Sequence, residues 1–145
     1  MAAAPTIEGR VALVTGASGG IGRAISLRLA AEGVAVGLAF ASEAAIAQRL
    51  AREIAAEGGR AVTLGSDLRR SDASDELVTA VERELGSIDI LVANAAVGRI
   101  ASYEEVDAAM FDETLAVNLR APYLLVRRVL PGMRERRFGR ILFTS

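Results

Sequence analysis

The chain contains no cysteine and no histidine. The first absence excludes disulfides and thiolate metal sites, and the second excludes serine–histidine catalysis and the commonest protein ligand of metals. No metal site is therefore predicted. Lysine is missing as well, because all 17 basic residues are arginines.

Excess charge of one sign and long apolar runs are also absent. The 17 arginines stand against 18 acidic residues, so the net charge of −1 gives no general attraction to nucleic acid or to anionic membranes. No apolar run approaches the roughly 20 residues of a membrane-spanning helix. Residues 1–8 lack the basic start and long apolar stretch of a signal peptide, so a cytoplasmic location is expected.

Short apolar runs alternate with helical patterns along the whole sequence. The runs predict five strands, at 10–15, 34–40, 60–65, 88–93 and 140–144. Helical spacing predicts helices at 20–31, from a cap at Ser42 to 57, from Ser71 or Asp72 to about 86, and at 107–137. Pro122 is expected to interrupt the last helix, and Pro131 could end it early.

The predicted strands are aliphatic rather than alternating, which is typical of strands covered on both faces. Right-handed crossovers then predict an α/β fold, a doubly wound parallel sheet of the Rossmann type, with strand order 3-2-1-4-5 and helices on both faces. No linker or repeat divides the chain, so a single nucleotide-binding domain, 1–145, is predicted.

Glycines gather where the first strand turns into the first helix, in Thr15-Gly-Ala-Ser-Gly-Gly-Ile-Gly22. Gly16 would permit a tight turn, Gly20 would let the backbone approach a pyrophosphate, and Gly22 would let the helix pack closely. Glycines alone often make only a turn, but a glycine run between a strand and a helix favours nucleotide binding. A P-loop is disfavoured because no Lys-Ser or Lys-Thr pair follows.

The loop and several later segments resemble the short-chain dehydrogenase/reductase family, in register from about residue 7 to residue 145, and most closely its 3-oxoacyl-[acyl-carrier-protein] reductases. The resemblance implies that Asp67 meets the adenine ring, that Asn94-Ala-Ala replaces the family's Asn-Ala-Gly, and that Asn118 belongs to its Asn-Ser-Tyr-Lys tetrad. The implied cofactor-binding residues are Gly16, Ser18, Gly20, Ile21, Gly22, Phe40, Ser42, Asp67, Leu68, Asn94, Ala95 and Ala96.

Several of these residues also have a plainer explanation. Asp67 and Asn94 could each cap a turn, and Asn118 could face solvent or bond a backbone carbonyl. Their order on the expected elements favours the functional interpretation.

The end of the second predicted strand favours NADP(H), with NAD(H) as the alternative. An acidic residue there would bind the ribose hydroxyls of NAD and repel a 2′-phosphate, but none occurs before Glu43. Ser42 could donate a hydrogen bond to that phosphate or only cap the next helix. Many NADP-using relatives carry a basic residue where Gly19 stands, and Arg23 nearby could simply lie on a solvated face.

The resemblance implies hydride transfer between NAD(P)(H) and a small carbonyl or alcohol substrate, with a tyrosine as general acid/base and a lysine that lowers its pKa. The sequence has no Tyr-x-x-x-Lys, and neither Tyr103 nor Tyr123 is placed to replace that tyrosine. Asn118 is the one tetrad member carried over, and Ser145 would join it only if the register shifted by one residue. We therefore expect the cofactor-binding part of the family fold, truncated relative to the family and inactive alone.

Two kinds of protein partner are expected. Arg137 falls where some reductases of the family meet an acidic acyl-carrier protein, although a solvated cluster at a helix end, with Arg134 and Arg136, is the favoured explanation. In the family that the chain resembles, the helix around Asn118 pairs with its counterpart in another subunit, so the resemblance implies a homodimer or homotetramer in the full-length form. The helix carries more apolar side chains than one sheet face requires, which is compatible with such pairing, although the core alone could absorb them. These side chains are Phe111, Leu115, Leu119, Leu124, Val126 and Val129.

Other outcomes stay open at this point. A non-catalytic nucleotide-binding or regulatory module would keep the glycine loop without Ser-Tyr-Lys chemistry. A methyltransferase fits poorly, because Phe40 stands where its ribose-binding acid is expected. An unpaired fifth strand at the sheet edge could also prevent stable folding.

Overall fold

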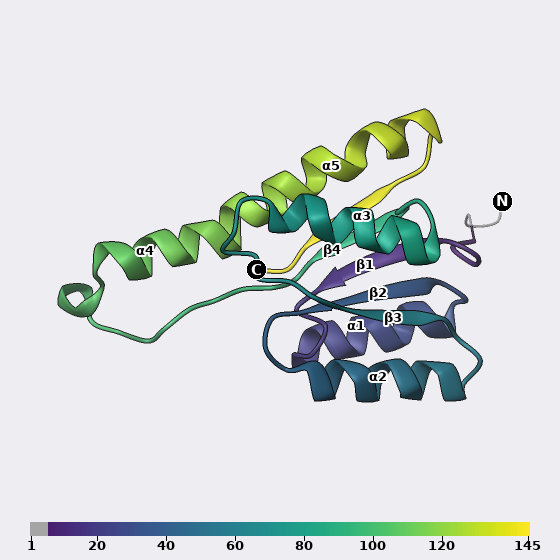
Figure 1. Cartoon of the computed structure of the whole chain (residues 1–145), viewed down its shortest axis with the longest axis horizontal. Helices are drawn as coiled ribbons and strands as arrows, with labels where there is room; N and C mark the ends of the chain where they lie inside the picture. The colour runs from purple at the N-terminus through teal and green to yellow at the C-terminus, as the bar shows by residue number, and fades with distance from the viewer. Residues whose placement is uncertain (1–5) are drawn as a thin grey trace, which may run out of the picture.

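The structure, a computed structural model, describes residues 6–145. Residues 1–5, which belong to the predicted single domain and to the segment considered as a signal peptide, lie outside the described residues. The described part forms one five-stranded sheet in the order β3-β2-β1-β4-β5, with helices on both faces (Figure 1). All neighbouring strands are parallel, so the predicted fold class and strand order are confirmed.

The strands begin and end within two residues of the predicted runs. Their bounds are β1 Val11–Thr15, β2 Ala35–Phe40, β3 Ala61–Gly65, β4 Ile90–Ala93 and β5 Arg140–Phe143. Every residue of β1 is buried, as expected of a central strand that is covered on both faces.

Helices fill the connections between the strands. Their bounds are α1 Gly20–Ala31, α2 Ala44–Ala56, α3 Ala73–Leu85, α4 Ala108–Leu115 and α5 Ala121–Glu135. A 3-10 turn, η1 (Tyr103–Glu105), precedes α4, and a π-helical turn, η2 (Ala116–Arg120), joins α4 to α5 without a break. The interruption expected at Pro122 is this π-helical turn, in which the Ala121 N–H donates to the Ala116 carbonyl.

Two of the predicted helix signals are wrong. Ser42 does not cap α2, because the chain bends through residues 41–42 and the helix begins only at Ala44, with no side-chain capping bond. Pro131 does not end α5 but lies inside it. Its position is exposed, so water can hydrate the carbonyl that the missing proline N–H leaves unbonded.

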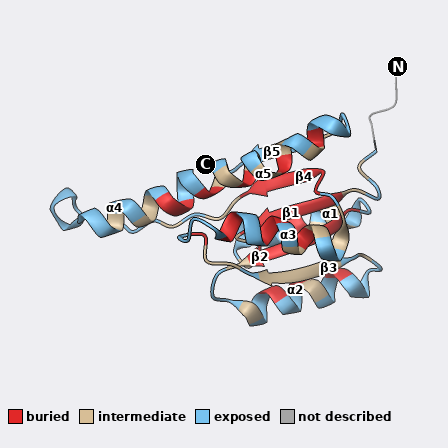
Figure 2. Ribbon diagram, turned by 45° about the horizontal axis from the view of Figure 1, so that its top comes forward, coloured by how far each residue is buried: buried red, intermediate tan, exposed pale blue. Residues whose placement is uncertain are grey.

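β1 is buried along its length (Figure 2), and its side chains belong to two apolar cores. Leu13 belongs to the core under α3 and α5, together with Leu91 and Leu125. Val14 belongs to the core under α1 and α2, together with Ile54. Among residues 6–145, no helix combines the length and the apolar character needed to cross a membrane.

The amino edge of the sheet holds a buried carboxylate, which gives Arg136 a partner that the sequence did not predict. Asp89 accepts from the Val11 N–H at 3.3 Å and lies 3.7 Å from Arg10 and 3.4 Å from Arg136. Arg136 also donates to the Ile88 carbonyl at 2.8 Å. Arg136 is exposed at the end of α5, as expected, but its side chain also reaches back to the start of β4.

Ile54 and Ile46 of α2 form a matched pair for testing the core, since they are 2% and 37% exposed. Ile54→Ala should lower the free energy of unfolding by about 2–5 kcal/mol, because it leaves a cavity between α2 and the sheet. Ile46→Ala should cost less than about 1 kcal/mol. Urea unfolding measures both variants, and equal losses would contradict this assignment of the core.

Candidate functional site

The carboxyl ends of the strands open into one crevice. Because β2 lies on one side of β1 and β4 on the other, the connecting loops part at this point and leave room for a ligand. A pocket of about 710 Å³ occupies the crevice. Every residue that the sequence predicts to bind the cofactor lines this pocket: Gly16, Ser18, Gly20, Ile21, Gly22, Phe40, Ser42, Asp67, Leu68, Asn94, Ala95 and Ala96.

The glycines of the first loop differ in what they do. Gly16 has a φ of +64°, and a Cβ there would lie 2.9 Å from the Ala95 Cα. A Cβ at Gly22 would overlap the Gly16 carbonyl oxygen, so both positions need glycine for packing. A Cβ at Gly20 would meet no protein atom within 4 Å, so packing does not explain this glycine.

The start of α1 is suited to an anion. Its first turn carries no acidic residue, and no side chain caps its N–H groups. Such groups have no partner within the helix and carry the positive end of its dipole. The open space beside Gly20 leaves them accessible, which fits a phosphate group.

Thr15, which the sequence did not single out, ties two of the loops together. It is buried, and its Oγ1 accepts from the N–H groups of Asn94 and Ala95, each at 3.0 Å. A polar residue at the end of an otherwise apolar strand is the signal that could have found it. The hydroxyl fixes the loop after β4 against the end of β1.

Asn94 does not cap its own turn, so that alternative is wrong. Its Nδ2 donates to the carbonyls of Thr15 at 3.1 Å and Gly16 at 3.3 Å. Its Oδ1 accepts from the Thr144 hydroxyl at 3.1 Å. The side chain therefore joins the glycine loop, the loop after β4 and the end of β5.

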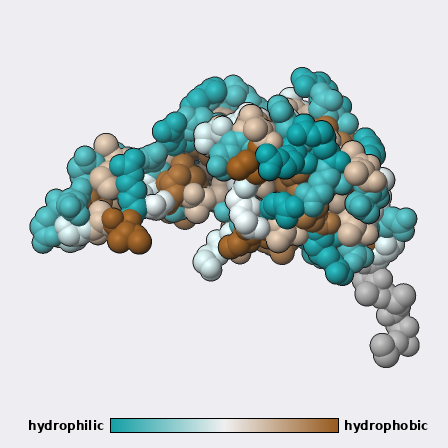
Figure 3. All heavy atoms as spheres, turned by 90° about the horizontal axis from the view of Figure 1, so that it is seen from below, coloured by the Kyte–Doolittle hydropathy of each residue, from teal (hydrophilic) through white to brown (hydrophobic). Residues whose placement is uncertain are grey.

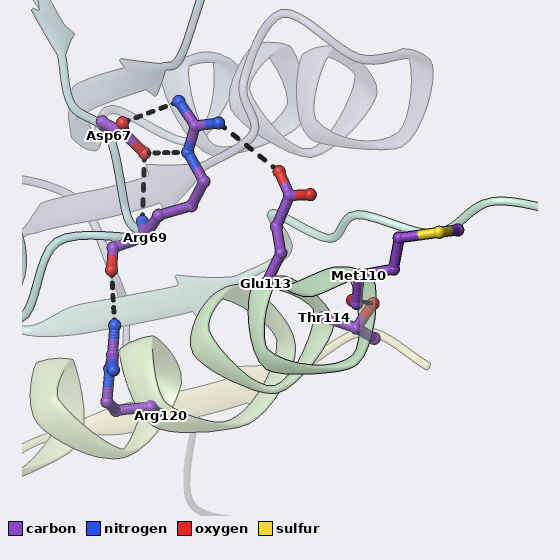
Figure 4. A network of polar contacts seen from close by, with 6 residues as sticks. All are labelled: Asp67, Arg69, Met110, Glu113, Thr114 and Arg120. Atoms are coloured by element: carbon purple, nitrogen blue, oxygen red, sulfur yellow. Dashed lines mark hydrogen bonds and ion pairs between the residues drawn. The ribbon is translucent and has the colours of Figure 1, made fainter. Parts of the chain in front are cut away.

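Asp67 both caps a turn and lines the pocket, so its two interpretations hold together. Its Oδ1 accepts from the Arg69 backbone N–H at 3.1 Å and from Arg69 Nε at 2.8 Å (Figure 4). Its Oδ2 accepts from a terminal nitrogen of Arg69 at 2.8 Å. These hydrogen bonds lower the pKa of Asp67 from 3.8 to about 2, so the group is a charged acceptor at neutral pH.

Asn118 is exposed, but its side chain also forms hydrogen bonds with the backbone of another residue. Its Oδ1 accepts from the Val97 N–H and its Nδ2 donates to the Val97 carbonyl, each at 2.8 Å. It lies in the π-helical turn, an irregularity often found at functional sites. Val97 lines the pocket, but Asn118 itself does not, and Ser145 is exposed and also lies outside the pocket lining.

The end of β2 brings together one residue that can donate a hydrogen bond to a phosphate and one acidic residue that would repel it. Phe40 and Ser42 line the pocket, and so does Glu43. Arg23 is exposed, as expected of a solvated face, but it forms an ion pair with Glu53 at 2.6 Å and does not line the pocket. Arg69, which sequence reasoning missed, is the one basic residue among residues 6–145 that lines the pocket.

The apolar side chains of the α4–α5 segment split into two groups. Val129 is buried in the core, and Val126 packs partly against it. Phe111, Leu115 and Leu119 are exposed by 56%, 41% and 64%. Figure 3 shows brown hydrophobic atoms on the projecting end of the molecule, which carries α4.

Comparison with known proteins agrees with this geometry. The family model for short chain dehydrogenases matches residues 10–145. The chain belongs to the short-chain dehydrogenase family. The predicted family is thereby confirmed.

Two curated relatives and one solved structure illustrate the likeness. The chain is 40% identical over 141 residues to a short chain dehydrogenase of Pseudocercospora fijiensis, covering 96% of this chain and 45% of the relative. It is 38% identical over 137 residues to an acetoacetyl-CoA reductase of Allochromatium vinosum, covering 94% and 56%. A metagenomic short-chain oxidoreductase crystallised with NADP superposes with a TM-score of 0.91 at 39% identity, over 97% of this chain and 64% of that one. The chain spans about half the length of the curated relatives it matches.

Replacement of Thr15 tests the junction between β1 and β4. Thr15→Val keeps the side-chain shape but leaves the N–H groups of Asn94 and Ala95 without their acceptor. The free energy of unfolding should fall by about 1–3 kcal/mol, measured by urea unfolding. Thr15→Ser keeps the hydroxyl and should lose less than about 1 kcal/mol, and a Thr15→Val protein as stable as the wild type would refute the role of the hydroxyl.

The depressed pKa of Asp67 predicts a specific acid sensitivity. Because the folded-state value is about 2 and the ordinary value 3.8, the Arg69 bonds stabilise the protein above the ordinary value and lose this effect as the pH falls toward 2. Asp67→Asn should flatten the fall in the free energy of unfolding across that range. Asp112→Asn is the control, since the exposed Asp112 forms no ion pair among the described residues. A carboxyl NMR titration of Asp67 with its midpoint at the ordinary value would contradict the prediction.

Proposed function

We propose that this chain is the cofactor-binding part of an NADP(H)-dependent oxidoreductase, which transfers hydride between the cofactor and a carbonyl or alcohol substrate. One observation carries the proposal: the glycine loop, the end of β2, the Asp67 turn and the Asn94 loop converge on one pocket at the carboxyl edge of the sheet. Membership of the short-chain dehydrogenase family supports the reaction class. The same membership favours this function over the non-catalytic alternative.

The residues present fit a dinucleotide. The uncapped start of α1 and the open space at Gly20 would receive the pyrophosphate. Asp67, as a charged acceptor, would bind the amino group of the adenine ring. Asn94, Ala95 and Ala96 would contact the rest of the cofactor.

NADP(H) is proposed over NAD(H) on two grounds. No acidic residue stands at positions 40–42, and the structural relative with a TM-score of 0.91 holds NADP. Ser42 would donate its hydroxyl to the 2′-phosphate, since that hydroxyl does not cap α2. Glu43 works against this preference, because this acidic residue also lines the pocket.

The bound cofactor would donate or accept the hydride, and this chain would supply position and support. Asn118 is proposed as the tetrad asparagine, and it holds the backbone of Val97 at the pocket wall while one amide hydrogen and one lone pair stay available. Ser145 keeps a catalytic role only in a register shifted by one residue. Since the sequence has no Tyr-x-x-x-Lys, we propose that these 145 residues bind the cofactor without reducing a carbonyl alone.

Two partner assignments follow as further parts of the proposal. The exposed side chains of Phe111, Leu115 and Leu119 support pairing of the α4–α5 segment with a second copy, in a homodimer or homotetramer. Arg137 is exposed at the end of α5, where a solvated position is the favoured explanation and contact with an acyl-carrier protein is the alternative. A cytoplasmic location stays a prediction from the sequence.

Titration of the chain with NADPH, followed by calorimetry, tests this function, and the wild type should show saturable binding. Gly20→Ala should leave stability unchanged or slightly raised, because its Cβ meets no protein atom within 4 Å and alanine favours a helix. The same methyl group should lower NADPH affinity about tenfold or more, by filling the space meant for the pyrophosphate.

Gly98→Ala is the matched control for that experiment. Its Cβ also meets nothing within 4 Å, but Gly98 does not line the nucleotide pocket, so the affinity should stay at the wild-type value. Wild-type affinity in Gly20→Ala, or no binding by the wild type at millimolar NADPH, would overturn the proposed site.

A further inference from the structure

All three guanidinium nitrogens of Arg69 donate hydrogen bonds to carboxylates at one wall of the nucleotide pocket (Figure 4). Nε and one terminal nitrogen donate to the two oxygens of Asp67, both at 2.8 Å. The other terminal nitrogen donates to Glu113 Oε1 on α4 at 3.4 Å. Asp67, Arg69 and Glu113 all line the pocket, so this chain of ion pairs joins the turn after β3 to α4 across its wall.

The backbone of Arg69 is held from a second direction. Arg120 donates from its guanidinium group to the Arg69 carbonyl. Arg120 lies in the same π-helical turn as Asn118. The turn that carries Asp67 is therefore fixed to the segment that supports the pocket wall at Val97.

The bonds to Arg69 determine what Asp67 can still accept. An ionised carboxylate offers about four lone-pair positions. Arg69 takes three of them, two on Oδ1 and one on Oδ2. One position on Oδ2 is left, which suits a single N–H donor.

We propose that Arg69 is a positioning residue, which holds Asp67 so that the pocket selects a purine with an amino group over one with a carbonyl oxygen at the same place. The inference rests on the proposed function, because it assumes that the base lies beside Asp67. An adenine amino group donates to the remaining acceptor position, whereas the carbonyl oxygen of hypoxanthine is repelled by the carboxylate. Without Arg69 the carboxylate is free to rotate into solvent, and the discrimination falls.

The test compares the dissociation constants of NADPH and of its hypoxanthine analogue, reduced nicotinamide hypoxanthine dinucleotide phosphate, by calorimetry. The wild type should prefer NADPH about tenfold or more, and Arg69→Gln should reduce this ratio to about twofold. Glu113→Gln should give an intermediate ratio, because it removes only the longer ion pair. Arg69→Lys should also lose selectivity, since an ammonium group cannot bind both carboxylate oxygens and Glu113 in the same fork geometry.

Arg70→Gln is the matched control. Arg70 is an exposed neighbour with its own ion pairs, to Asp72 at 2.8 Å and Glu76 at 3.0 Å, but it does not line the pocket. Its ratio should equal that of the wild type. Thermal unfolding of each variant shows whether it is folded. If Arg69→Gln does not fold, the affinity ratios of Arg69→Lys and Glu113→Gln test whether Arg69 positions Asp67.

The outcomes separate the two levels of the proposal. Equal weakening of both nucleotides, with the wild-type ratio kept in the folded Arg69 variants, would mean that Arg69 only supports the structure and would overturn the inference. A wild-type chain that binds neither nucleotide overturns the proposed function and the inference with it. A ratio that falls in the Arg69 variants and not in Arg70→Gln supports both.

Discussion

The pocket depends on the hydrogen bonds that join the end of β1 to the end of β4. Thr15 Oγ1 accepts hydrogen bonds from two backbone N–H groups of the loop after β4. The Asn94 side-chain amide donates hydrogen bonds to the carbonyls of Thr15 and Gly16. Neighbouring parallel strands would otherwise let these loops diverge, because their connections leave in opposite directions. With the loops tied, the glycine loop and the Asn94 loop form the two sides of one crevice.

Polar groups at the two edges of the sheet serve different purposes. At the amino edge, the buried Asp89 is met by Arg10, Arg136 and the Val11 N–H, which compensate its charge within the protein. At the carboxyl edge, Asp67 keeps an acceptor position and the start of α1 keeps its uncapped N–H groups. The charge of Asp89 is therefore compensated within the protein, whereas these groups of the carboxyl edge are available to a ligand.

The sequence predicted the strand order from its local patterns, whereas most residues of the pocket lining were predicted from the resemblance to the short-chain dehydrogenase/reductase family. Aliphatic runs mark buried strands, and the roles of Gly16 and Gly22 follow from sterics that only glycine meets. Long-range partners were beyond its reach: Arg69 and Glu113 are 44 residues apart, and Arg136 reaches Asp89 across 47 residues. The predicted cap at Ser42 was wrong because the bend after β2 moves the N-cap to Glu43 and the helix start to Ala44, one residue later than expected, and no local pattern distinguishes the two starts.

NMR mapping of backbone amides during an NADPH titration tests the central claim most directly. The account predicts shifts in the glycine loop at residues 16–22, in the Asp67 turn and in the Asn94 loop, all of which border the pocket. Gly33, Gly58 and Gly59, which line a separate pocket at the amino edge, should not move. Shifts confined to that amino-edge pocket, or no shifts at millimolar NADPH, would contradict the account.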